Sequence, residues 1–99
     1  MEQITTDTNT DTLKVVGDLI AIKWTGDNEA VFDKLYPATH YKKYDGTMYL
    51  SICFSMPVGW WLLFTKKEAK RGLYESCSVE RFLHDYKPQF DKLWNEKHQ

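Results

Sequence analysis

The chain has 99 residues, of which 42% are hydrophobic and 15% aromatic, and this size predicts a single small domain whose aromatic side chains supply much of the buried area. The 13 Lys and Arg residues against 14 Asp and Glu residues give a net charge of −1. This balance excludes a general binder of phosphate backbones, which would be distinctly basic, and a mimic of DNA, which would be distinctly acidic.

The first segment, residues 1–12 (MEQITTDTNTDT), is polar and rich in Thr and Asp. Because it has little apolar surface to bury, we expect a disordered or loosely attached tail, followed by one α+β domain over residues 13–99. No apolar segment follows Met1, and no run approaches the roughly 20 apolar residues that span a bilayer. Cys53 and Cys77 are too few for the disulfide framework of a small secreted domain. We therefore expect a soluble, reduced, cytoplasmic protein that does not contact membranes.

Residues 15–24 predict the first strand, because apolar and mostly β-branched side chains alternate along them. Gly17-Asp18 forms a turn or bulge near its start. Asp27 is the expected N-cap of a short helix that ends before Pro37. The apolar face of this helix consists of Val31, Phe32 and Leu35.

Residues 48–56 show the cleanest alternation in the chain, with five apolar side chains on one face: Met48, Leu50, Ile52, Phe54 and Met56. This pattern predicts one strand, preceded by a turn at Asp45-Gly46. Residues 60–65 predict a second strand that pairs with the first in a hairpin, through a reversal at residues 57–59. Because the second strand is apolar on both faces, it is either central and covered on both sides or the carrier of an exposed patch.

Residues 66–71 predict a charged turn, and residues 73–76 predict a short edge strand. Ser78 is the expected N-cap of a C-terminal helix that continues to about residue 97. Its apolar stripe comprises Val79, Phe82, Leu83, Tyr86, Phe90, Leu93 and Trp94. The expected fold class is α+β, with a mostly antiparallel sheet of about four strands packed against a short helix and a C-terminal helix kinked or split at Pro88.

Two parts of the chain match, in order and spacing, phrases of a family of small phage and prophage proteins called PGDYG proteins. The first part is Trp24-Thr25-Gly26-Asp27-Asn28, which precedes the short helix. The second is the ordered set Gly59, Trp61, Gly72, Tyr74, Cys77, Glu80, Phe82, Tyr86 and Pro88. The chain resembles this family over residues 19–88.

The resemblance implies a phage or prophage origin and the cytoplasm of a bacterial host cell as the place of action. Small phage accessory proteins often bind a host protein, including the host's defence machinery, so the resemblance also implies a host protein as the partner. One position departs from the family pattern. The family's acidic residue after glycine falls at Trp60, and Val58 is an extra residue after Pro57, so the role of that acid is not carried over to this chain.

The candidate zinc ligands are four side chains: His40, Cys53, Cys77 and His84. They lack CxxC or HxxxH spacing, so we expect no metal. The candidate catalytic pairs are Cys77 with His84 and Glu75 with Glu80. Helical periodicity places His84 beside Leu83 but in solvent, and nothing in the pattern raises a carboxylate pKa or marks a cleft. We expect no catalytic residues, no cofactor and no enzymatic activity.

The residues expected to carry function are aromatic or basic: Trp60, Trp61, Tyr74, Lys66, Lys67, Lys70 and Arg71. The leading hypothesis is a protein-binding module whose exposed aromatic side chains anchor a partner. The alternative is a small-ligand module, in which aromatic side chains in a pocket between sheet and helix stack on a nucleotide-like ring. A third hypothesis, binding of single-stranded nucleic acid, competes with charges that merely protect a sheet edge from aggregation. Phe90, Leu93 and Trp94 also suggest burial against a second copy of the chain.

Overall fold

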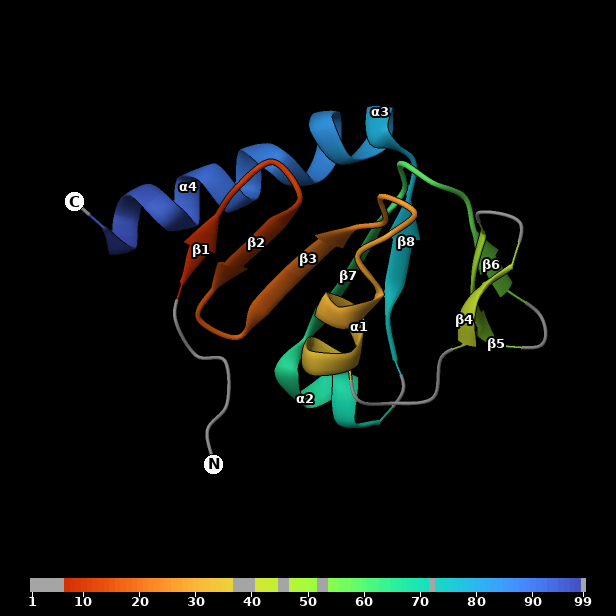
Figure 1. Ribbon diagram of the computed structural model, residues 1–99. Coiled ribbons are helices and arrows are strands. Elements are labelled where there is room, and N and C mark those ends of the chain that lie inside the picture. The colour runs from red at the N-terminus through yellow and green to blue at the C-terminus, as the bar shows by residue number, and fades with distance from the viewer. Residues whose placement is uncertain (1–6, 37–40, 45–46, 52–53, 72, 99) are drawn as a thin grey trace.

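The computed structural model describes residues 7–36, 41–44, 47–51, 54–71 and 73–98, which form two antiparallel sheets and several helical segments (Figure 1). The main sheet has the order β1-β2-β3-β7-β8, with bounds Thr8–Asn9, Leu13–Val16, Leu19–Lys23, Trp61–Thr65 and Glu75–Cys77. The smaller sheet has the order β4-β5-β6, with bounds Tyr41–Tyr44, Thr47–Ser51 and Phe54–Met56. The helical segments are α1 (Glu29–Leu35), α2 (Lys66–Lys70), α3 (Val79–Arg81), the π-helical turn η1 (Phe82–Tyr86) and α4 (Lys87–Lys97). The predicted α+β class, with an antiparallel sheet and a C-terminal helix, is confirmed.

β7 is an interior strand of the main sheet, because it pairs with β3 on one side and with β8 on the other. Leu62 and Phe64 point into one core, which α1 and α2 cover. Trp61 and Leu63 point into a second core, which contains Phe82 of the C-terminal helical run. The strand that is apolar on both faces is therefore covered on both sides and does not carry an exposed patch.

The predicted strand over residues 15–24 is in fact a hairpin. β2 and β3 pair from Leu13↔Ile22 to Val16↔Leu19, and Gly17-Asp18 form the turn between them. Gly17 has φ +60°, a left-handed conformation that glycine adopts without a steric penalty, so the reversal occurs there.

The N-cap of α1 is Asn28 rather than the predicted Asp27. The Asn28 side chain bonds within the preceding loop, where its Oδ1 accepts from Thr25 N at 3.0 Å and its Nδ2 donates to the Lys23 carbonyl at 2.8 Å. Asp27 instead accepts a hydrogen bond from Thr25 Oγ1. The N-cap of α1 is thus determined by the hydrogen bonds of the preceding loop, which residue preferences at N-caps do not reveal.

The single strand predicted over residues 48–56 is also wrong, because β5 and β6 pair with each other through Met48↔Met56 and Tyr49↔Ser55. The predicted hairpin between this segment and β7 is therefore not formed. Both sides of β7 are occupied by β3 and β8, and two backbone bonds join the start of β7 to the end of β3. Gly59 N donates to the Trp24 carbonyl at 2.7 Å, and Trp24 N donates to the Trp60 carbonyl at 2.8 Å. Residues 37–40, 45–46 and 52–53, including the predicted Asp45-Gly46 turn, lie outside the described residues.

The described fold begins before Leu13, the expected start of the domain. Residues 1–6 of the predicted tail lie outside the described residues, but Thr8 and Asn9 form β1 and pair with β2. The Asp7 carboxylate, only 8% exposed, accepts from His98 Nε2 at 2.7 Å and from Gly17 N at 3.1 Å, and it lies 3.2 Å from Lys97 Nζ. These bonds, the one from His98 first, lower the pKa of Asp7 to about 2. A polar segment is thus held by hydrogen bonds rather than by apolar burial.

The C-terminal helical run begins as predicted, with Ser78 Oγ accepting a hydrogen bond from Arg81 N at 3.3 Å. The interruption expected at Pro88 is found in the turn before it. Lys87 N–H bonds to the Phe82 carbonyl, five residues back, in the π-helical turn η1. Pro88 has no N–H to continue the α-helical bonding, so a widened turn is a way to accommodate it without breaking the helix. None of the helices in the described part of the chain has the length and apolar composition of a membrane span.

The widened turn changes which side chains are buried. Phe82 and Phe90 lie in the core, and Tyr86 and Trp94 pack against it, so the buried stripe recurs every fourth residue. An α-helix advances by about 3.6 residues per turn and would rotate such a stripe away from the sheet, whereas a π turn compensates the drift. Leu83, predicted to belong to the apolar stripe, is consequently 52% exposed.

Candidate functional site

The predicted aromatic anchors are not exposed side chains. Trp61 is only 4% exposed, and its ring stacks on Phe82 with centroids 3.8 Å apart and planes inclined by 5°. Trp60 and Tyr74 are half-buried against the other core, where Tyr74 meets the edge of Tyr36. Trp61 is therefore not an exposed anchor, because helices cover both faces of the sheet, whereas binding at the half-buried Trp60 and Tyr74 stays a prediction.

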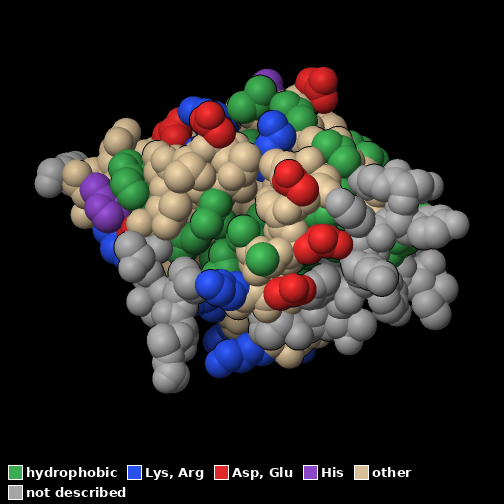
Figure 2. Space-filling model, in the orientation of Figure 1, with side chains coloured by type: hydrophobic (Ala, Val, Ile, Leu, Met, Phe, Trp, Pro, Cys, Tyr) green, Lys and Arg blue, Asp and Glu red, His purple; other side chains and the backbone are tan. Residues whose placement is uncertain are grey.

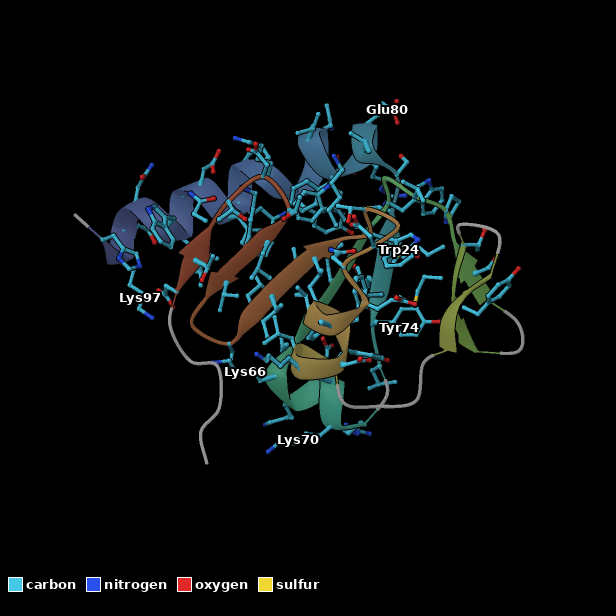
Figure 3. The ribbon with its side chains drawn as sticks, in the orientation of Figure 1. Trp24, Lys66, Lys70, Tyr74, Glu80 and Lys97 are labelled. Atoms are coloured by element: carbon cyan, nitrogen blue, oxygen red, sulfur yellow. The ribbon has the colours of Figure 1, made fainter. Side chains whose placement is uncertain are left out.

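The charged segment predicted as a turn over residues 66–71 instead forms the helix α2. Its first turn is closed by a capping box between Thr65 and Glu68. Lys67, Lys70 and Arg71 are exposed, while Lys66 is half-buried. In Figure 3 the labelled Lys66 and Lys70 lie at one edge of the molecule, and Glu80 lies at the opposite edge.

This basic cluster does not lie beside the tryptophans. Trp60 precedes β7 and Lys66 follows it, so the strand separates them by about 17 Å along its length. The juxtaposition of cations and aromatic rings that motivated the nucleic-acid hypothesis is therefore not formed.

The candidate catalytic and metal-binding residues do not converge in the described part of the chain. Cys77 is buried, and burial raises the pKa of its thiol to about 11, so the thiol is protonated at neutral pH. The His84 side chain is 89% exposed and contacts Asp85 at 2.6 Å. Glu75 and Glu80 are both exposed, and Glu75 accepts a hydrogen bond from the Tyr86 hydroxyl. No group of three or more metal-ligating side chains occurs among the residues described, and His40 and Cys53 lie outside them.

An apolar surface is present where the sequence did not predict one. It consists of Val58, Val79 and Leu83, which we call the apolar ridge. Val58 and Leu83 are each 52% exposed. The loop carrying Val58 lies against α3, since a methyl group added at Gly59 would stand 3.6 Å from Val79 Cγ2, while Val58 Cγ2 itself lies next to Gly26, 3.5 Å from a methyl group added there. Leu83 follows Val79 by four residues and so lies on the same side of the helical run.

The surroundings of the apolar ridge are polar and charged. Figure 2 shows apolar side chains over α3 and η1 and over the loop before β7, with charged side chains next to them. Glu80, Arg81 and His84 are exposed on the same helical segments. Arg81 Nε pairs with Asp85 Oδ2 at 3.0 Å, and the bonds from His84 and Arg81 together lower the pKa of Asp85. An apolar centre inside a charged rim is the usual composition of a protein contact surface.

Two features of the sequence could have indicated this surface. Val58 stands between Pro57 and Gly59, in a reversal where a polar residue would be the usual choice. Phe82, Tyr86 and Phe90 recur at every fourth residue, and in a helix with a widened turn this spacing leaves Leu83 outside the buried stripe. Comparisons with protein-family models, curated proteins and solved structures found no match for this chain.

Proposed function

We propose that this chain is a non-catalytic protein-binding module and that the apolar ridge forms the centre of its contact surface. The observation that carries the proposal is the pair of branched aliphatic side chains, Val58 and Leu83, each about half exposed on adjoining segments. Neighbouring apolar side chains on a surface mark contact sites more often than isolated ones do. Burial of the exposed halves would contribute about 1 kcal/mol each, so the ridge acts as an anchor within a larger interface.

The partner in this proposal is a host protein of a phage-carrying bacterium, with a host defence protein as one such target. This part of the proposal depends on the resemblance to small phage proteins and not on the geometry of the ridge. The charged rim of Glu80, Arg81 and His84 adds specificity, because a partner must match both signs of charge around the apolar centre.

The alternatives have less support from the geometry. A nucleotide-like ligand needs exposed aromatic faces, but Trp61 is buried in its stack with Phe82. A pocket between the main sheet and the C-terminal helical run is lined by two carboxylates, Glu68 and Glu75, which repel phosphate groups. For nucleic acid, the cluster on α2 offers cations, but Trp60 lies beyond the opposite end of β7.

The test is affinity capture from bacterial lysate with three immobilised proteins: the wild type, Leu83→Asp and Leu93→Asp. Leu93 is 39% exposed on α4, so its substitution is a matched control for a charge placed on an exposed leucine. We expect a partner that the wild type and Leu93→Asp retain, and whose binding to Leu83→Asp is weaker by about tenfold or more. The proposal is wrong if nothing is retained, or if Leu83→Asp retains every captured protein as well as the wild type does.

Light scattering of the free protein addresses the second-copy hypothesis. Phe90 is 2% exposed and already packs in the core with Phe82, while Trp94 packs beside it and stacks on His98. Only Leu93 of that trio remains exposed, so we expect a monomer at micromolar concentration. A stable dimer that Leu83→Asp dissociates would identify the partner of the apolar ridge as a second copy of this chain.

A further inference from the structure

A half-open pocket of about 210 Å³ lies between the main sheet and the C-terminal helical run. Its apolar lining consists of Leu19 on β3, Leu63 on β7 and Phe90 on α4. Its polar lining consists of Glu68, Glu75, Tyr86 and Gln89. The pocket adjoins α2 and the C-terminal end of β7, whereas the apolar ridge lies near the start of β7, so the two sites are distinct.

The polar groups of this pocket are mainly hydrogen-bond acceptors toward a ligand. Tyr86 uses its hydroxyl hydrogen to donate to Glu75 Oε1 at 3.0 Å, which leaves the hydroxyl oxygen as an acceptor. Gln89 Nε2 donates one of its two N–H groups to the Asp85 carbonyl at 2.9 Å, so the amide keeps one N–H donor beside its acceptor oxygen. The carboxylates of Glu68 and Glu75 accept only, Glu68 Oε1 already accepts from Thr65 N at 2.9 Å, and the lining contains no Lys or Arg.

A rim dominated by acceptors, two of them carboxylates, over an apolar floor selects the chemistry of its occupant. A guanidinium group carries five N–H donors and no acceptor, and the arginine stem adds three methylene groups. We infer that this pocket binds the side chain of an arginine presented by the partner protein, with the stem on Leu19, Leu63 and Phe90 and the guanidinium toward Glu68 and Glu75. The inference rests on the proposed protein-binding function but uses a different part of the surface.

The size of the pocket supports a single side chain rather than a larger molecule. Pockets for drug-sized ligands and cofactors enclose about 300–1,000 Å³, which exceeds the volume found here. The Tyr86–Glu75 bond also joins the helical run to the edge strand β8, so one acceptor is held in place before a ligand arrives. A fixed acceptor binds a charged donor with a smaller loss of side-chain entropy.

The test is a titration of the folded wild-type protein with three blocked tripeptides, followed by amide chemical shifts. The peptides are acetyl-Gly-Arg-Gly-amide, the citrulline analogue, which keeps the shape without the charge, and the norleucine analogue, which keeps only the stem. We expect the arginine peptide to bind at roughly millimolar concentration and to shift the amides of Leu19, Leu63 and Phe90. The citrulline and norleucine peptides should bind about tenfold more weakly.

Two variants test the role of the carboxylate. Glu75→Gln keeps an acceptor for the Tyr86 hydroxyl but removes the charge, and it should weaken arginine-peptide binding about tenfold. Glu80→Gln, an exposed glutamate outside the pocket, should leave that binding unchanged.

The inference is overturned if all three peptides shift the pocket amides equally, if none does at roughly tenfold the expected concentration, or if free L-arginine binds more tightly than the blocked peptide. The last outcome would identify a small-molecule site. Because the comparison of peptides uses the wild type, it decides the matter even if Glu75→Gln does not fold. Failure of the peptides would leave the Leu83→Asp test of the proposed function unaffected.

Discussion

The two ends of the C-terminal helical run are held to the molecule by different forces. At its far end, Lys97 and His98 bind the nearly buried carboxylate of Asp7, and the Trp94 ring stacks on His98 with centroids 4.0 Å apart. At its beginning, Phe82 fills the core while Leu83, the next residue, faces solvent. The far end is thus held by polar bonds and exposes Leu93 to 39%, whereas the beginning exposes Leu83 to 52% next to the loop that carries Val58. The proposed contact surface lies at the beginning.

The largest expected effect on stability comes from the buried face at the beginning of the run. Trp61→Ala removes the ring that stacks on Phe82, so we expect a loss of about 3–5 kcal/mol in the free energy of unfolding, measured by urea denaturation. A variant that stays folded with a loss below about 1 kcal/mol would contradict the assignment of Trp61 to the core.

A smaller effect, with a distinct pH dependence, is expected at the far end. The pKa of Asp7 is lowered from 3.8 to about 2, so the carboxylate stabilises the fold fully above about pH 4 and loses this contribution as pH falls toward 2. Asp7→Asn should therefore lower the unfolding temperature at about pH 6, and the difference from the wild type should vanish near pH 2. Asp11→Asn, in the exposed turn after β1, is the matched control and should leave the unfolding temperature unchanged. A difference for Asp7→Asn that persists near pH 2 would exclude an ionic role for Asp7.

The smallest effect is expected at the apolar ridge itself. Leu83→Ala should change the free energy of unfolding by no more than about 0.5 kcal/mol, because the side chain is half exposed. Phe82→Ala, one residue away, should cost about 3–5 kcal/mol in the same assay. A cost of about 2 kcal/mol or more for Leu83→Ala would mean that Leu83 packs within the fold, and the contrast between the ends would fail.

The sequence predicted those parts of the fold that depend on local pattern. Ser78 is an N-cap because its hydroxyl accepts from an amide three residues later, and the apolar residues on both faces of β7 match an interior strand covered on both sides. Alternation could not show that residues 47–56 reverse direction, since a period of two is the same in one strand and in two paired strands. The order of strands around β7 depends on contacts between distant segments, which no single window contains.

The candidate site was missed for related reasons. Trp61 was predicted to be an exposed anchor because Phe82, the ring that covers it, lies 21 residues later in the chain. Only the folded structure brings the two rings together. Leu83 was predicted to be buried because α-helical spacing from Val79 to Tyr86 places it in the apolar stripe, whereas η1 widens the turn before Pro88. Val58 is exposed because Gly59, with φ +99°, reverses the chain beside α3.

The measurement that tests the binding surface most directly is hydrogen exchange of the protein with and without its captured partner. We expect slower exchange at the amides of residues 58–60 and 79–83 in the complex, and unchanged exchange at residues 94–98. Slower exchange confined to residues 94–98, or no change at residues 79–83, would contradict the assignment of the apolar ridge as the contact surface.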